Sequence, residues 1–310
     1  MNLFKNCKII ICILFFLSVF AVQGSAINAE IVVVLSYQNN NFEATLRKYF
    51  QYLDKNNVSY SVTKFNLSAD NPEKVIAEIR NRKPEIVLAV GTNAFNLLKD
   101  KIAETPIVFS YCYVNANAEL NTNLYGVRLN IPAKKQLEML KKVAPSKKRV
   151  GVFYSKNSTE FYKEIKEACE MQGFQLISQE IQSDRDFASS VMEIGKKIDC
   201  FLIIPDSGLF FVQSLKYLFL ESLRQKFMVI GLSSYFTKAG AMMSLECDYD
   251  ELGNQEGELT VRILKNETQG IERAQGAQKL KYSINVLVAE RLDVKINASI
   301  TDDANEIFGK

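Results

Sequence analysis

Two turns in this 310-residue chain combine residue types that could bind a small polar molecule. Gly91-Thr92 and Asp206-Ser207 each follow a short apolar run and precede a helical pattern. At such a turn, backbone N–H groups and a hydroxyl can hold a carboxylate against the helix N-terminus. The Asp206 carboxylate could pair with an ammonium group, or it could cap the following helix. Both a binding role and a capping role fit each turn.

Aromatic and polar side chains are frequent at the ends of neighbouring apolar runs. Tyr and Phe offer flat apolar area with little conformational entropy to lose, which suits an aromatic or branched apolar ligand. Most of the aromatic residues are nevertheless expected in the core. The predicted ligand-binding residues are Tyr37, Gln38, Gly91, Thr92, Ser110, Tyr113, Tyr154, Asn157, Asp206, Ser207, Ser233 and Tyr235.

The composition disfavours catalysis. The chain has no His, which excludes a Ser-His-Asp triad and the commonest zinc and iron sites. It also lacks a Walker loop, a glycine-rich dinucleotide turn and a nucleophile elbow. We therefore expect a binding protein rather than an enzyme, with no cofactor and no bound metal.

Residues 1–26 are typical of a cleaved signal peptide. Lys5 and Lys8 precede an apolar stretch at residues 9–22, and Gly24-Ser25-Ala26 provides small residues for cleavage. The stretch is shorter than the roughly 20 apolar residues of a membrane anchor. We predict an exported, periplasmic or extracytoplasmic protein.

Removing Lys5 and Lys8 leaves 36 basic and 35 acidic residues, a net charge of +1. Near neutrality argues against nucleic acid or an anionic membrane as the partner. Four cysteines remain, which allow three disulfide pairings; they are Cys112, Cys169, Cys200 and Cys247. Because they lie in apolar patterns, free and buried thiols are favoured over disulfides.

Short apolar runs alternate with helical patterns throughout the mature chain. Runs at residues 31–36, 58–65, 86–90 and 107–110 are separated by helices, which is typical of a parallel sheet covered on both faces. The same order recurs about 115–120 residues later, beginning with the run at residues 149–154. The sequence therefore predicts an α/β protein with two similar Rossmann-like lobes.

Two facing lobes of this kind would form a ligand cleft. In open parallel sheets, ligands bind beyond the carboxyl ends of the strands. We assign residues 27–128 to the first lobe, 129–232 to the second, and 233–275 to a return to the first lobe. Residues 276–310 form a C-terminal segment without a lobe assignment. Several crossings of this kind would make a hinge.

A helix is expected after Asp248. Asp248 and Glu251 form a capping box, with acidic residues against the positive end of the helix dipole. Gly253 and Gly257 each cost about 1 kcal/mol relative to Ala within a helix. We expect close packing of this helix against a neighbouring backbone.

Several segments give the chain a family resemblance. In the closing region they are Gly231, Ser233, Ala239-Gly240-Ala241, residues 248–255 and residues 261–264. Earlier segments are residues 90–94, 106–109, 125–127, 136–140, 149–152 and 204–207. With these residues, the chain from 31 to 308 resembles the tryptophan- and tyrosine-associated substrate-binding proteins of ABC transporters.

The resemblance implies a type I periplasmic binding protein fold whose lobes close on a small molecule and deliver it to an ABC permease. It implies an aromatic or branched apolar amino acid, or a similar metabolite, as ligand, and we expect a monomer. The alternative is an extracytoplasmic sensing module for a signalling partner. One departure stands at Tyr113-Val114-Asn115, where the family often has Ser-Asp-Pro.

Ligand binding to the closed form would raise the melting temperature. If Thr92 and Asp206 bind ligand, replacing either by Ala should weaken this effect and leave the unliganded protein nearly as stable.

Overall fold

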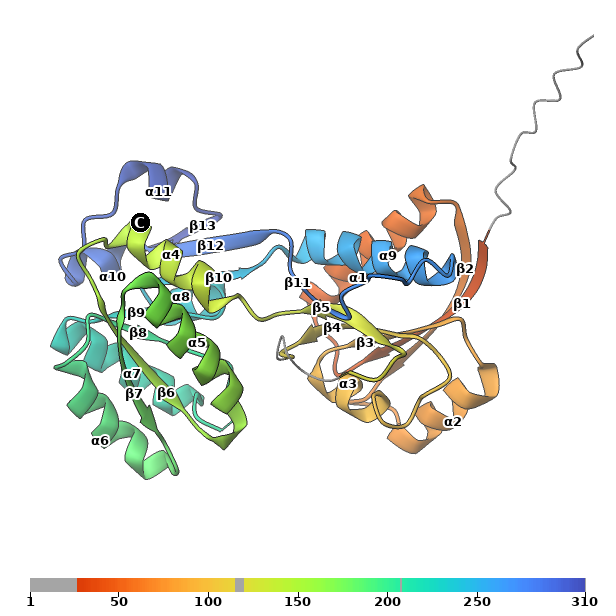
Figure 1. Ribbon diagram of the computed structural model, residues 1–310, viewed down its shortest axis with the longest axis horizontal. Coiled ribbons are helices and arrows are strands. Elements are labelled where there is room, and N and C mark those ends of the chain that lie inside the picture. The colour runs from red at the N-terminus through yellow and green to blue at the C-terminus, as the bar shows by residue number, and fades with distance from the viewer. Residues whose placement is uncertain (1–26, 115–119, 207, 310) are drawn as a thin grey trace, which may run out of the picture.

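The protein folds into two α/β lobes joined by thin connections, as the computed structural model shows (Figure 1). The structure describes residues 27–114, 120–206 and 208–309. The predicted signal peptide and Ser207 therefore lie outside the described residues. Among the described residues, no helix has both the length and the apolar character that a bilayer crossing requires.

The first lobe contains a six-stranded sheet in the order β11-β5-β4-β3-β1-β2. Its strands are β1 (Ile27–Leu35), β2 (Val58–Asn66), β3 (Ile86–Val90), β4 (Ile107–Cys112), β5 (Leu124–Arg128) and β11 (Ala274–Gly276). Its helices are α1 (Asn40–Lys55), α2 (Pro72–Arg82), α3 (Thr92–Leu98) and α9 (Tyr249–Leu264). All five strand pairings in this sheet are parallel.

The second lobe contains a seven-stranded sheet in the order β13-β12-β10-β9-β8-β6-β7. Its strands are β6 (Arg149–Tyr154), β7 (Gln175–Glu180), β8 (Cys200–Leu202), β9 (Met228–Gly231), β10 (Met243–Cys247), β12 (Leu280–Asn285) and β13 (Glu306–Phe308). Its helices are α4 (Ala133–Val143), the 3-10 helix η1 (Lys156–Ser158), α5 (Thr159–Gln172), α6 (Asp184–Gly195), α7 (Val212–Gln225), α8 (Ser234–Ala239), α10 (Val286–Arg291) and α11 (Ala298–Asp302). Only the β10–β12 pairing is antiparallel in this part of the structure.

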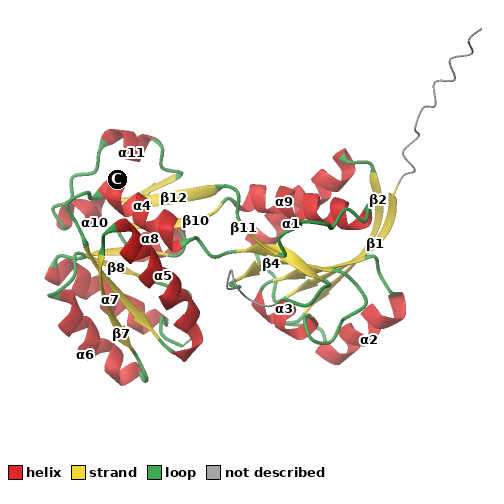
Figure 2. Ribbon diagram, in the orientation of Figure 1, coloured by secondary structure: helices red, strands yellow, loops and turns green. Residues whose placement is uncertain are grey.

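Helices cover both faces of each sheet (Figure 2). In β1, Ile31 and Val33 face the core beneath α1 and α9, whereas Val32 and Val34 face the core beneath α2 and α3. A strand buried on both faces reads as a continuous apolar run, which is why these strands were recognisable. The prediction of two Rossmann-like lobes with parallel sheets is confirmed.

The two halves share one topology. The order β5-β4-β3-β1-β2 in the first sheet corresponds to β10-β9-β8-β6-β7 in the second. Each half therefore has a fifth strand beyond the four expected from the sequence. The internal duplication inferred from the repeated pattern is present in the strand order.

The return to the first lobe differs from the expectation. Residues 233–247 do not return: α8 packs on β10 and β12, and β10 pairs with β9 in the second sheet. The apolar run at 243–247 is the counterpart of β5, so the chain adds the fifth strand of the second half before it crosses. The C-terminal strands β12 and β13 also belong to the second sheet.

The chain crosses between the lobes after β5, between β10 and α9, and between β11 and β12 (Figure 1). Side chains connect these crossings. The Asp248 carboxylate lies 3.1 Å from both Lys279 Nζ and Lys281 Nζ, and the Cys247 thiol lies 3.7 Å from the Leu129 carbonyl oxygen. The predicted multi-crossing hinge is confirmed.

Three local predictions are also confirmed, one of them in part. Asp248 caps α9 by accepting hydrogen bonds from the backbone N–H groups of Asp250 and Glu251. Its own N–H donates to the Lys279 carbonyl rather than to Glu251, so the reciprocal half of the predicted capping box is not formed. A Cβ on Gly253 would lie 2.3 Å from the Thr45 carbonyl oxygen of α1, so the absence of a side chain lets the helices approach. The four mature cysteines are free thiols, and all are buried.

Candidate functional site

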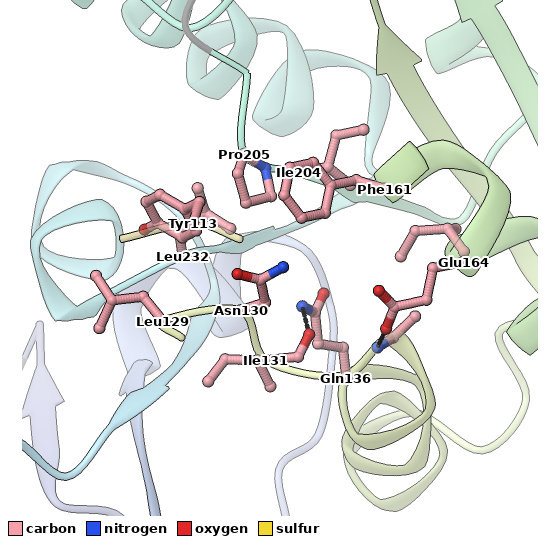
Figure 3. Close-up of a pocket in the computed structure, with 12 residues that line it drawn as sticks. Tyr113, Leu129, Asn130, Ile131, Gln136, Phe161, Glu164, Ile204, Pro205 and Leu232 are labelled. Atoms are coloured by element: carbon pink, nitrogen blue, oxygen red, sulfur yellow. Dashed lines mark hydrogen bonds between the residues drawn. The ribbon is translucent and has the colours of Figure 1, made fainter. Parts of the chain in front are cut away.

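A pocket lies where the lobes meet the first crossing (Figure 3). We call it the hinge pocket. Its lining comes from the end of β4 in the first lobe, the crossing itself, helices α4 and α5, and the ends of β8 and β9 in the second lobe. The lining residues are Tyr113, Leu129, Asn130, Ile131, Ala133, Gln136, Phe161, Glu164, Ile165, Ile204, Pro205 and Leu232. This is the position that a ligand between two parallel sheets is expected to occupy.

One side of the hinge pocket is apolar and the other carries amides. Tyr113, Phe161, Pro205 and Leu232 lie on one side in Figure 3, and Asn130 lies opposite them. Asn130 and Gln136 are 4% and 7% exposed, whereas Tyr113 is 41% exposed. An aromatic rim that opens on buried amides suits a ligand with an apolar body and a polar end.

The backbone at Tyr111 is in a left-handed conformation, with φ of 55°. Such a conformation is uncommon for a residue other than Gly and clusters at functional sites. It coincides with a register shift between β4 and β5, after which the chain leads to Tyr113. The Tyr111 hydroxyl bonds to Thr45 Oγ1 at 2.8 Å and donates to the Asn41 carbonyl at 3.1 Å. These bonds hold the strand end that supplies Tyr113.

Aromatic rings form a row in the first lobe. Tyr37, which is 48% exposed, lies 5.0 Å from Phe42 between ring centroids, and Phe42 lies 4.6 Å from Tyr111. Tyr111 stacks on Tyr249 at 5.3 Å, and the Tyr249 hydroxyl donates to Glu246 at 3.0 Å. Burial raises the pKa of both tyrosines, Tyr111 and Tyr249. The row therefore stays neutral and extends from an exposed strand end to the second crossing.

The predicted site at Gly91-Thr92 is built differently from the expectation. Gly91 has φ of 93°, and a Cβ there would lie 2.5 Å from Ser36 Oγ. Ser36 accepts a hydrogen bond from the Ala94 N–H at 2.9 Å and so satisfies the start of α3. Thr92 makes no capping bond and is exposed. Ser36, which the sequence analysis did not select, organises this turn.

Ser110 lies in the core rather than at the pocket. Its side chain is fully buried, and its hydroxyl lies near the Glu256 carboxyl without completing a hydrogen bond. Its carbonyl accepts from the Gly91 N–H at 2.8 Å. Helix α9 packs on β4 at this position, so Ser110 lies away from the hinge pocket, and its ligand role stays a prediction.

The Asp206 carboxylate is engaged within the protein. One oxygen accepts from the Ser155 N–H at 3.1 Å, from the Ser155 hydroxyl at 2.6 Å and from the Ser158 hydroxyl at 2.5 Å. The other oxygen accepts from the Gly208 N–H at 2.7 Å. These bonds fix η1 and the loop after β8. Asp206 does not cap the helix that follows it, because α7 begins after Phe211 and has no side-chain cap.

The remaining predicted residues lie at strand ends without meeting in one pocket. Tyr154 stacks on Tyr162 at 4.0 Å, and Tyr235 is 65% exposed at the start of α8. Gln38 and Asn157 are exposed, and Ser233 is half-buried. Of the eleven predicted residues that the structure describes, Tyr113 is the one that lines the hinge pocket. The ligand role of the others stays a prediction.

Asn130 and Gln136 are not among the residues predicted from the sequence. Asn130 lies next to the predicted boundary between the lobes, after residue 128, and Gln136 opens one of the family-like segments. Both segments could be recognised in the sequence, but neither pattern indicates that an amide side chain is buried. Burial of these amides depends on strand ends from the second lobe.

Comparisons with known proteins agree with this architecture. A tyrosine-binding protein of Clostridioides difficile (strain R20291) is 20% identical over 256 residues, covering 79% of this chain and 73% of the relative. The ligand-free, open structure of a substrate binding protein with adhesive properties from Clostridium difficile has a TM-score of 0.74 at 18% identity. That similarity covers 91% of this chain and 100% of the other.

A second solved structure, an ABC domain in complex with L-Trp from Streptococcus pneumonia, has a TM-score of 0.64 at 20% identity. It covers 91% of this chain and 100% of the other chain. The fold is thus that of the type I periplasmic binding proteins. The family model for ABC transporter substrate binding proteins matches residues 34–308, and the chain belongs to this family.

Proposed function

We propose that the protein is the exported solute receptor of an ABC importer and that it holds an aromatic amino acid at the hinge pocket. The observation that carries this proposal is the position of the pocket, which takes its lining from both lobes and from the first crossing. A molecule bound there contacts both lobes, so binding favours the closed form.

Exposed aromatic side chains support an aromatic ligand. Tyr37 and Tyr113 in the first lobe and Tyr235 in the second are 48%, 41% and 65% exposed. Such area is unfavourable in water, and a flat apolar ligand covers it. The names of two relatives, one binding tyrosine and one in complex with L-Trp, point to the same ligand class.

The surroundings of the protein follow from this role. The signal-like residues 1–26 export the chain, and the closed lobes present the ligand to a permease in the membrane. The receptor acts as a monomer that binds its ligand without altering it. The remaining predicted residues at the strand ends, such as Thr92 and Asn157, contact the ligand as the lobes close.

Calorimetric titration with tyrosine, tryptophan, phenylalanine, leucine and ribose tests the ligand class. We expect binding of at least one aromatic amino acid and none of ribose. The chain contains no Trp, so the emission of bound L-tryptophan can be followed without tryptophan emission from the protein. A ligand at a hundredfold excess over its Kd raises the free energy of unfolding by roughly 2.7 kcal/mol. For a chain of this size, that corresponds to an increase in Tm of about 4–6 °C. Binding of ribose with no response to any amino acid would contradict the proposal.

A further inference from the structure

Two side-chain amides in the hinge pocket each leave one polar atom without a partner. Asn130 Oδ1 accepts from the Val114 N–H at 3.1 Å, and Asn130 Nδ2 has no hydrogen bond. Gln136 Nε2 donates to the Ile131 carbonyl at 3.0 Å, and Gln136 Oε1 has no hydrogen bond. The pocket therefore holds one unpaired donor and one unpaired acceptor.

A buried polar atom without a hydrogen-bond partner lowers the stability of the fold. Each costs about 1–3 kcal/mol when it is desolvated without a partner, so two in one pocket mark a place that suits a hydrogen-bonding group, either a water or part of a ligand. Figure 3 shows both amides on the same side of the pocket, across from Pro205 and Phe161. Both are also held in place by their other hydrogen bond, so little ordering is needed on binding.

The pocket favours a neutral group. None of the twelve lining residues that the structure describes is Lys or Arg. The one carboxylate, that of Glu164, accepts from the Ala133 N–H at 2.9 Å. Burying a charged group requires a charged partner, and a ligand carboxylate would find none here. A neutral group that both donates and accepts, such as a hydroxyl, satisfies both amides.

The size of the void agrees with this chemistry. About 20 Å³ is available to the centre of a water-sized group, where one water needs roughly 10–15 Å³. A hydroxyl fits this space, and the attached ring would lie against the apolar side formed by Tyr113, Phe161 and Leu232.

We propose that the hinge pocket reads the hydroxyl of a phenolic ligand. Asn130 Nδ2 donates to the phenol oxygen, and Gln136 Oε1 accepts the phenol proton. The protein thereby distinguishes tyrosine-type from phenylalanine-type ligands. This inference rests on the proposed function and assigns to Asn130 and Gln136 the choice among aromatic ligands.

The structural reason for selectivity is the cost of leaving the amides unpaired. Phenylalanine would exclude water from the pocket without replacing its hydrogen bonds. A site that hydrogen-bonds a hydroxyl rejects the analogue without it far more strongly than an apolar pocket rejects an added group. We expect the Kd for phenylalanine to exceed that for tyrosine by about 30-fold or more, since two neutral hydrogen bonds are lost.

The test is calorimetric measurement of both Kd values in the wild type, Gln136→Met and Asn130→Asp. Gln136→Met removes the acceptor at similar side-chain length. Asn130→Asp keeps the oxygen that accepts from Val114 but removes the donor. In both variants we expect the phenylalanine-to-tyrosine ratio to fall to within about threefold, chiefly through weaker tyrosine binding.

Gln225→Met provides the matched control. Gln225 has the same hydrogen-bonding pattern, with Nε2 donating to Glu221 at 2.7 Å and Oε1 unpaired, but it lies on α7 outside the hinge pocket. Its replacement should leave the ratio at the wild-type value. The unliganded melting temperature of each variant separates loss of fold from loss of selectivity.

Three results would overturn the inference. Equal wild-type affinity for tyrosine and phenylalanine, or an unchanged ratio in both pocket variants, removes the hydroxyl role and leaves the aromatic ligand in place. Absence of binding to every aromatic amino acid removes both this inference and the proposed function.

Discussion

At the scale of single residues, the binding lobes are organised by side chains that bond within the protein. Ser36 satisfies the start of α3, and Asp206 joins η1 to the loop after β8. Neither role is visible from residue type alone, because a hydroxyl or carboxylate at a strand end serves capping and ligand binding equally well. The hydrogen bonds in the folded protein decide between capping and ligand binding.

The bonds of Asp206 change the expected effect of its removal. Asp206→Ala leaves the donors of Ser155, Ser158 and Gly208 unpaired, so we expect the unliganded protein to lose about 2–3 kcal/mol of stability, instead of remaining nearly unchanged. Urea denaturation measures this loss. Thr92→Ala is the control: because Thr92 is exposed and makes no cap bond, its stability should change by less than about 0.5 kcal/mol. If Asp206→Ala is as stable as the wild type, the hydrogen bonds of Asp206 do not stabilise the fold.

Glu256 is a buried carboxyl whose protonation should affect stability. It is fully buried in α9, and its two oxygens lack hydrogen-bond partners. Burial raises the pKa of Glu256 well above its ordinary value, and the nearby Ser110 hydroxyl only partly opposes this. The folded protein therefore holds this proton more tightly than the unfolded chain does.

This raised pKa makes the stability of the folded protein depend on pH. This contribution to stability is fully present below the ordinary Glu pKa of 4.5 and declines as pH rises toward the higher folded pKa. Glu256→Gln keeps the neutral shape and should remove the decline, which makes the variant more stable than the wild type at pH 8. Midpoints of urea denaturation at pH 4, 6 and 8 measure this pH dependence for the wild type and the variant. Glu258→Gln, at an exposed position of α9, should keep the wild-type profile.

At the scale of elements, α1 and α9 show how glycine sets a helix distance. The Gly253 and Gly257 positions face Thr45, Lys48 and Tyr52 of α1, and an added Cβ would lie 2.8 Å or less from its nearest atom. The two helices cover the same face of the first sheet (Figure 2). Since α9 directly follows the second crossing, its close packing anchors the hinge to the first lobe.

Replacing Gly253 tests whether the absence of a side chain there allows α1 and α9 to pack closely. On propensity alone, Gly253→Ala would stabilise the helix by about 1 kcal/mol. The contact with the Thr45 carbonyl should reverse the sign and cost about 1–3 kcal/mol through overpacking. Glu258→Ala on the exposed face should be neutral or slightly stabilising. A stabilised Gly253→Ala protein in thermal denaturation would show that the helices can separate without cost.

At the scale of the whole molecule, the hinge couples the lobes through Asp248. This residue caps α9 in the first lobe and pairs with Lys281 of β12 in the second. Its backbone N–H also donates to the Lys279 carbonyl at 3.0 Å. Two of the three crossings are therefore held together by one residue.

The ion pairs of Asp248 predict a loss of stability in acid. Burial alone would raise the pKa of Asp248, but hydrogen bonds from Lys281 and Lys279 outweigh it and lower the pKa. A lowered folded pKa gives stability that is present above the ordinary value of 3.8 and is lost as pH falls through the folded pKa. Asp248→Asn retains a capping side chain and should lose about 1 kcal/mol at pH 7, with a weaker acid dependence.

Denaturation at pH 7 and pH 3 compares this variant with the wild type. Asp293→Asn is the control, since Asp293 pairs with Lys226 at an exposed position and should contribute little. Equal effects of the two substitutions would show that the hinge pair is no stronger than a surface pair.

The sequence alone determined the local elements and the duplicated α/β plan. Strands such as β3 and β4 are buried on both faces, so burial appears directly as an apolar run, and the cap at Asp248 is readable because its partners lie within three residues. Only the tertiary structure decided that residues 243–247 pair in the second sheet before the chain crosses. It likewise decided that Asn130 and Gln136 are buried with unpaired atoms. Both outcomes depend on contacts between segments distant in the chain, which local periodicity does not specify.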